Sequence, residues 1–106
     1  PADFTPDLLE LGNLQLNRKT FIMTGPEGSY RLGSKEFQIL EMLMSSPGCL
    51  ISAEQFMERI WGYDTEAEIS VVWVYISYLR KKLTAVGANA EIKATRNVGY
   101  SLEVTQ

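Results

Sequence analysis

The sequence has no histidine and only one cysteine, Cys49, among its 106 residues. Histidine is the commonest general base near neutral pH and the commonest ligand of transition metals. With no histidine beside it, a lone cysteine can form neither an intramolecular disulfide nor a zinc site of four protein ligands. These absences argue against an enzyme and against a bound cofactor, and they favour a protein of the reducing cytoplasm.

Glycine-rich phosphate loops and long apolar runs are also missing. The glycines match neither G-x-x-x-x-G-K nor G-x-G-x-x-G, the patterns that cradle nucleotide phosphates. The longest purely apolar run has only a few residues, whereas a bilayer-spanning helix needs about 20. The chain is nevertheless 45% hydrophobic and 10% aromatic, enough for one core. We expect a single domain over residues 8–106, with no membrane partner, after the end of an interdomain linker at residues 1–7.

Charge is distributed unevenly along the chain. The net charge of −3 argues, taken alone, against nucleic acid, because neutralising phosphates supplies most sequence-independent binding. Residues 77–96, however, carry five basic side chains against one acidic, and residues 54–68 carry five acidic against one basic. This polarity predicts two surfaces with different partners. Ordinary solvated charge is the alternative.

The first third of the chain has the pattern of a small antiparallel sheet. Turn residues separate four short strand-like runs, at residues 8–11, 14–16, 20–23 and 30–32. The hydrophobic period then changes to that of a helix, which Ser34 caps and which ends at residues 45–48.

Two further helices are predicted after this point. A capping box formed by Ser52 and Gln55 starts the second helix near residue 53, and Gly62 ends it. The third helix begins near residue 69 and ends near Gly87. Its core stripe recurs at spacings of three and four residues and comprises Ile69, Val72, Ile76, Leu79 and Leu83.

The opposite face of the third helix is unlike an ordinary solvated face. It mixes apolar and aromatic side chains with hydroxyls and basic groups, namely Ser70, Val71, Val74, Ser77, Tyr78 and Lys81, with Tyr75 and Lys82 at its flank. Such a face fits a DNA major groove, where valine and thymine methyl groups meet and hydroxyls reach bases or phosphates. The alternative is a helix buried on both sides or packed on a second copy.

The last part of the chain has the pattern of a hairpin. Strand-like runs at 92–95 and 100–104 enclose a turn, and Arg96 at its tip can enter a minor groove or grip a phosphate. Trp61, at the end of an amphipathic helix, is interpreted as a core residue.

Five segments of the chain carry a recognisable pattern. In order they are Leu32-x-x-Lys35-Glu36-Phe37-x-Ile39-Leu40, Ser46-Pro47-Gly48, Ile60-Trp61-Gly62-Tyr63-Asp64, Val74-Tyr75-Ile76-Ser77-x-Leu79-Arg80-Lys81-Lys82-Leu83 and Thr95-Arg96-x-x-Gly99-Tyr100. Together they resemble the DNA-binding domain of OmpR/PhoB-type two-component response regulators, over residues 8–104. The resemblance implies an α+β winged helix-turn-helix fold with an N-terminal four-stranded antiparallel sheet, three helices and a C-terminal β-hairpin wing.

The resemblance also implies roles for individual residues. The third helix is the expected recognition helix in the major groove of double-stranded DNA, and the wing is expected at the minor groove. The implied DNA contacts are Ser70, Val74, Tyr75, Ser77, Tyr78, Arg80, Lys81, Lys82, Arg96 and Tyr100. The implied RNA polymerase-facing loop, whose acidity suits a basic protein, comprises Tyr63, Asp64, Thr65, Glu66, Ala67 and Glu68. A receiver domain phosphorylated by a sensor histidine kinase is expected to precede this domain, which is expected to dimerise on DNA.

The chain departs from the family pattern at a few positions. Many members have Arg where Tyr78 and Ala53 stand, Asp where Trp73 stands, and Gly where Asn97 stands. Trp73 lies about 60° from the core stripe, so packing against the second helix is the alternative to a DNA contact. Tyr78 has two possible positions, pointing into the groove or folded back.

The leading hypothesis is a sequence-specific DNA-binding domain of a transcription regulator in a two-component phosphorelay. The alternative is a winged-helix protein-interaction module without DNA binding, which the net negative charge and the apolar outer face of the third helix favour.

Overall fold

Four short antiparallel strands open the computed structural model, which describes residues 7–62 and 66–105. The sheet has the order β1-β2-β3-β4, formed by β1 (Leu8–Leu11), β2 (Leu14–Asn17), β3 (Ile22–Gly25) and β4 (Gly28–Arg31). The alternation of side chains in strands explains which residues enter the core. Leu14, Leu16 and Met23 are fully buried, whereas Gln15 between the two leucines is exposed.

β3 begins two residues later than the sequence predicted because the chain turns at Phe21. Phe21 has a φ of 65°, a left-handed conformation that interrupts an extended strand. The side-chain oxygen of Asn17 accepts hydrogen bonds from the backbone N–H groups of Lys19 and Thr20 and so fixes the preceding turn. The ring of Phe21 stacks on Phe37 with a centroid distance of 4.0 Å. This aromatic contact accompanies the unfavourable backbone geometry.

The first two helices begin with different caps. α1 (Ser34–Ser45) has Gly33 as its N-cap residue, so the prediction that Ser34 caps it was wrong by one position. Instead, the carboxylate of Glu36 accepts the Gly33 N–H at 3.2 Å. The capping box of α2 (Ala53–Phe56) is confirmed, because Ser52 and Gln55 exchange side-chain to backbone hydrogen bonds of 3.1 and 2.8 Å.

The second helix ends in a wider turn. Its last residues form the π-helical turn η1 (Met57–Trp61), and Gly62 follows with a φ of 79°. The predicted end of this helix at Gly62 is therefore confirmed. The change from α to π geometry was not predicted, because the spacing of the hydrophobic residues does not show it.

The third helix, α3 (Ser70–Ala85), is the longest element of the described chain. Its stripe of Val72, Ile76, Leu79 and Leu83 is buried as predicted. Ile69 is 47% exposed, so its assignment to that stripe was wrong. Ile69 is the N-cap residue of α3, so it lies at the end of the helix, where its side chain is covered from fewer sides than the rest of the stripe.

A two-stranded hairpin completes the fold. β5 (Ala90–Thr95) and β6 (Gly99–Val104) pair in an antiparallel register with Thr95 opposite Gly99. Ile51, in the link before α2, exchanges backbone hydrogen bonds of 2.8 and 2.9 Å with Tyr100 of β6. This bridge ties the hairpin to the helices.

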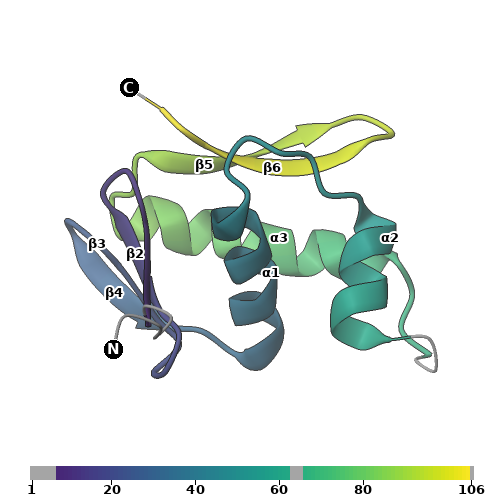
Figure 1. The fold of residues 1–106 in the computed structure, drawn as a ribbon, viewed down its shortest axis with the longest axis horizontal. Coiled ribbons are helices and arrows are strands. Elements are labelled where there is room, and N and C mark those ends of the chain that lie inside the picture. Colours follow the sequence, from purple (N-terminus) through teal and green to yellow (C-terminus); the bar gives the residue numbers. More distant parts are fainter. Residues whose placement is uncertain (1–6, 63–65, 106) are drawn as a thin grey trace, which may run out of the picture.

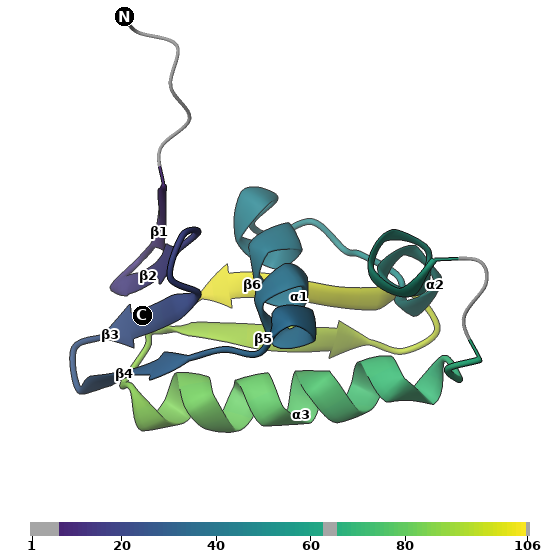
Figure 2. The same ribbon diagram turned by 90° about the horizontal axis from the view of Figure 1, so that it is seen from below.

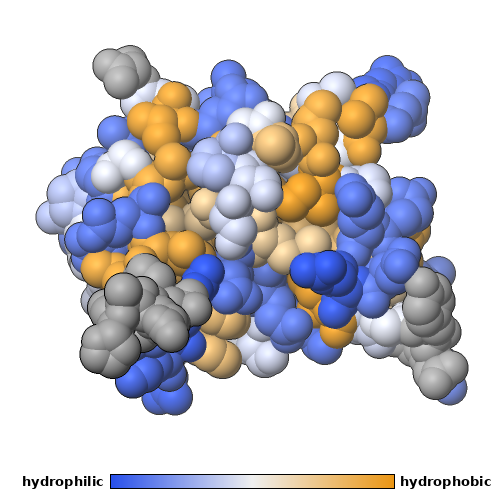
Figure 3. All heavy atoms as spheres, in the orientation of Figure 1, coloured by the Kyte–Doolittle hydropathy of each residue, from blue (hydrophilic) through white to orange (hydrophobic). Residues whose placement is uncertain are grey.

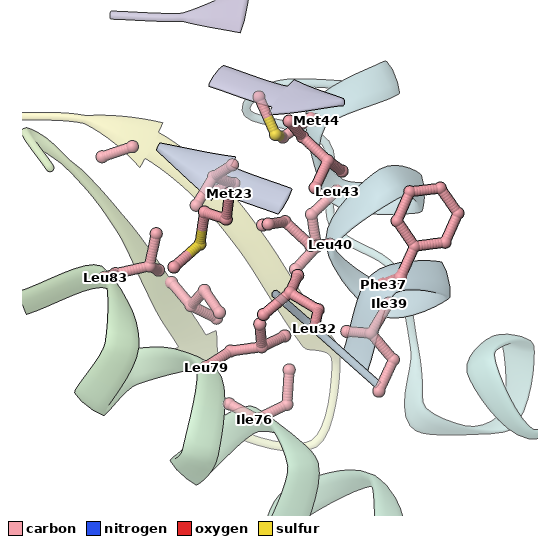
Figure 4. Close-up of a cluster of buried hydrophobic side chains, with 14 of the residues drawn as sticks. Met23, Leu32, Phe37, Ile39, Leu40, Leu43, Met44, Ile76, Leu79 and Leu83 are labelled. Carbon is pink, nitrogen blue, oxygen red and sulfur yellow. The ribbon is translucent and has the colours of Figure 1, made fainter. Parts of the chain in front are cut away.

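The elements are arranged around one core. The four-stranded sheet lies beside the C-terminal half of α3, and α2 lies beside its N-terminal half, while α1 crosses between them (Figures 1 and 2). Figure 4 shows Leu40 and Leu43 of α1 facing Leu79 and Leu83 of α3, with Met23 of β3 between the helices. The predicted α+β architecture of sheet, three helices and hairpin is confirmed. In the described part of the chain, no helix has the length and apolarity to cross a membrane.

Candidate nucleic-acid interface

One face of α3 is uncovered along its whole length. Figure 2 shows the other elements on the opposite side of this helix. At about 100° per residue, the exposed residues of the helix fall on one side, opposite the buried stripe. They are Ser70, Trp73, Val74, Tyr78, Lys81, Thr84 and Ala85, and we call them the outer face. The outer face therefore contains Ser70, Val74, Tyr78 and Lys81 as predicted, whereas Val71 and Ser77 of the predicted face are half-buried.

Trp73 does not pack against the second helix. Its side chain is 58% exposed, the largest fraction among the big apolar residues of the described chain. The space beside the second helix is taken by Tyr75, whose ring lies 5.7 Å from that of Trp61. Trp73 consequently belongs to the outer face, and sequence reasoning did not include it among the expected contacts.

A series of side-chain contacts connects Lys35 to Tyr78. The ammonium of Lys35 lies 5.2 Å from the ring centre of Trp61, which contacts Tyr75. Tyr75 in turn meets Tyr78 edge to face at 6.0 Å and 88°, a favoured aromatic geometry. Tyr78 remains 48% exposed. Trp61 is half-buried and bridges η1 to α3, so its interpretation as packing material fits its contacts.

Two of the predicted basic contacts have partners within the domain. Arg80 donates from Nε and Nη2 to the carbonyl oxygen of Ile92 on β5, at 3.2 and 3.0 Å. Lys82 donates to both carboxylate oxygens of Glu36 on α1, at 2.9 and 2.8 Å, and Glu36 is only 7% exposed. Lys81 is exposed between them. The face of α3 thus projects one lysine outward while its basic neighbours connect α3 to α1 and β5.

The hydroxyl of Ser77 is also engaged locally. Ser77 Oγ donates to the carbonyl oxygen of Trp73 at 3.1 Å, one turn earlier in the helix. Such back-bonding satisfies the hydroxyl donor and leaves the oxygen available as an acceptor. Ser70 lies at the beginning of α3 and is exposed.

The tip of the hairpin lies at the end where α3 begins, in both ribbon views (Figures 1 and 2). Arg96 in this tip is exposed, and Asn97 after it has a φ of 63°, a conformation that asparagine tolerates. Tyr100 is half-buried, and its ring lies 6.4 Å from that of Phe56. Gly99 brings β6 against the Ile51 backbone, since a Cβ there would lie 2.6 Å from the Ile51 carbonyl carbon.

Comparison with known proteins identifies this arrangement. The family model described as "Transcriptional regulatory protein, C terminal" matches residues 27–102. The chain belongs to this family. It is 38% identical over 95 residues to the transcriptional regulatory protein DltR of Streptococcus agalactiae, covering 90% of the chain and 42% of DltR. It is also 38% identical over 96 residues to the phosphate regulon regulator PhoB of Rhizobium meliloti, with 91% and 42% covered. The chain thus spans less than half the length of these relatives.

Solved structures of the same family share the fold. The C-terminal domain of the nisin resistance regulator NsrR superposes with a TM-score of 0.76 at 28% identity, covering 92% of this chain and 99% of that one. The DNA-binding domain of the response regulator AdeR, solved with an intercistronic region, has a TM-score of 0.77 at 22% identity, with 90% and 98% covered. The transcriptional regulatory domain described here is therefore a winged helix of the OmpR/PhoB type.

The remaining predicted residues of this OmpR/PhoB-type domain belong to the acidic loop and to the expected linker. Of the acidic loop, Tyr63, Asp64 and Thr65 lie outside the described residues, whereas Glu66 and Glu68 are exposed and Ala67 is half-buried. Residues 1–6 of the expected linker also lie outside them, and Asp7 pairs with Lys19 at 3.4 Å.

The side of the domain opposite the outer face carries α1 and α2 (Figure 2). Figure 3, drawn from that side, shows hydrophilic and hydrophobic side chains intermixed. Exposed carboxylates of Glu54 and Glu58 belong to the second helix and η1. Within the described residues, no cluster of Cys, Asp and Glu is arranged to hold a metal ion.

Proposed function

We propose that this domain binds double-stranded DNA sequence-specifically and so regulates transcription. The carrying observation is the outer face of α3, which no other element of the described chain covers and which the hairpin tip flanks. An α-helix with side chains is about 10–12 Å wide, close to the width of the B-DNA major groove. A helix so placed fits into the groove while the hairpin reaches the adjacent minor groove.

The contacts divide into positioning and reading. Lys81 on the outer face and Arg96 in the hairpin tip are both exposed, so they are suited to hold phosphates, with Arg96 at the minor groove. Arg80 and Lys82 have internal partners, so we expect smaller contributions from them. The other proposed DNA contacts, to bases or to the sugar-phosphate backbone, are Ser70, Val74, Tyr75, Ser77, Tyr78 and Tyr100.

We also propose partners for the longer protein to which such a domain belongs. By its family, the domain would follow a receiver domain phosphorylated by a sensor histidine kinase, and two copies would bind direct repeats. The loop at residues 63–68 is acidic, which suits a basic surface of RNA polymerase and disfavours DNA. This division gives the domain one face for DNA and another for the transcription machinery.

Selection from a random duplex pool tests the proposal. The domain should enrich one short motif, and its affinity for that motif should fall with rising salt, with a slope of about −0.9 for each phosphate neutralised. Lys81→Met should flatten the slope by about one contact. Failure to enrich any motif by a domain shown to be folded would refute DNA reading.

A protein-interaction module is the second candidate because of the exposed apolar groups of α3. Trp73, Val74 and Tyr78 are 58%, 37% and 48% exposed, and such surface can bury itself against another protein. Salt separates the candidates. Association through apolar groups persists at high salt, whereas DNA binding weakens steeply.

A further inference from the structure

We propose that Trp73 determines specificity together with Val74, and that the two read thymine methyl groups in a thymine-rich half-site. This inference rests on the proposed DNA binding and names the class of sequence that α3 reads. Both side chains lie on the outer face, and they are neighbours at its N-terminal half, 58% and 37% exposed. Both present apolar surface to the solvent in this half of the proposed contact.

The groups that usually read adenine and cytosine are missing from α3. Guanine is read by Arg or Lys, adenine by Asn or Gln, and cytosine by Asp or Glu. Residues 70–85 include no Asn, Gln, Asp or Glu. Adenine and cytosine therefore find no partner of the usual kind on this helix.

The cations of α3 do not reach the same part of its outer face. Arg80 is held by the Ile92 carbonyl and Lys82 by the Glu36 carboxylate, as described above. Lys81 lies two turns beyond Val74, near the C-terminal end of the outer face. The charged groups are thus suited to the sugar-phosphate backbone, and the stretch around Trp73 and Val74 offers mainly carbon.

Hydroxyls supply the remaining polarity of that stretch without choosing one base. Ser77 Oγ already donates to the Trp73 carbonyl, and a serine hydroxyl pairs with several base edges. The thymine C5 methyl group is the apolar feature that a base presents in the major groove. Contact between these apolar side chains and a thymine methyl group removes both from water, which favours thymine over the other bases at these positions.

Replacing thymine by uracil tests this inference directly, because uracil pairs identically and lacks only the methyl group. The 106-residue chain would be titrated against fluorescent duplexes of its selected motif, each with one thymine replaced. Each contacted methyl group should weaken binding about fourfold when it is removed. Trp73→Ala and Val74→Ala should each abolish the effect at one thymine, and Trp73→Phe should retain it in part. These double-mutant cycles isolate the contact itself.

A matched control uses another exposed apolar side chain. Leu8 on β1 is 39% exposed, and Figure 2 places β1 far from the outer face of α3. Leu8→Ala should leave both affinity and uracil sensitivity unchanged. A motif rich in G·C pairs, or equal uracil effects in the native domain and both alanine variants, would overturn the thymine inference while DNA binding stands. Enrichment of no motif would overturn both.

Discussion

The ion pair of Glu36 and Lys82 provides the sharpest test of how the domain is held together. The Glu36 carboxylate is nearly buried and accepts two short hydrogen bonds from the Lys82 ammonium, joining α1 to α3. Lys82→Met keeps the aliphatic stem and removes the charge. The carboxylate then keeps its bond to the Gly33 N–H but loses its cation.

The expected cost follows from the exposure of the two side chains. Removing one partner of a fully buried pair costs about 3–5 kcal/mol, and hydrogen bonds to charged groups contribute about 1.5–3 kcal/mol. The Lys82 side chain is 28% exposed, so water can replace part of the lost interaction. We expect the free energy of unfolding to fall by about 2 kcal/mol, which lowers the Tm by roughly 8–16 °C in a domain of this size.

Urea unfolding followed by circular dichroism measures this cost. Lys81→Met is the matched control, because it makes the same chemical change at an exposed neighbour and should stay within about 0.5 kcal/mol of the native domain. The double variant Glu36→Gln/Lys82→Met should lose about 1–2 kcal/mol less stability than the two single variants lose in sum. If Lys82→Met costs no more than Lys81→Met, the pair does not stabilise the domain and the reasoning is wrong.

Two other perturbations test single contacts. Gly99→Ala should destabilise the domain by about 1–3 kcal/mol more than Gly28→Ala. The two glycines have similar φ values, 159° and 157°, but only a Cβ at Gly99 would collide with the Ile51 backbone. Thermal unfolding of both variants measures the difference in stability, and equal losses would contradict the close approach. Trp61→Ala removes the aromatic contact with Tyr75, which should lower the free energy of unfolding by about 0.5–1.5 kcal/mol beyond the cost of the lost burial. The variant should also bind the selected DNA more weakly. Unchanged affinity would show that this contact does not position α3.

The sequence predicted well whatever depends on neighbours in the chain. The capping box at Ser52 and the buried stripe of α3 are set by spacings of three and four residues; the capping box was confirmed, and so was the stripe from Val72 to Leu83. The turn at Phe21 was missed because a positive φ in a phenylalanine has no local signature; its ring contact with Phe37 forms only when the fold brings the two together. Strand β3 was displaced for the same reason.

The candidate site was harder to predict because its flanking residues have distant partners. Glu36 and Lys82 are 46 positions apart, and the period of a helix cannot show that such a lysine is paired internally. Likewise, Tyr75 and not Trp73 contacts Trp61. The sequence placed four residues correctly on the exposed face, Ser70, Val74, Tyr78 and Lys81, but it did not place Trp73 there and it could not show which basic neighbours are already engaged.

These flanking contacts determine how α3 is rotated about its own axis. Arg80 connects one flank to β5, while Tyr75 and Lys82 connect the other to η1 and α1. Because the helix turns about 100° per residue, a small rotation would carry Trp73 or Val74 away from the groove. Loss of a flanking contact should therefore weaken binding to all sequences alike, whereas a change at Val74 should alter which sequence is preferred. Comparing selected motifs with affinities separates the two kinds of residue, and a flank variant with a new preferred motif would contradict this division.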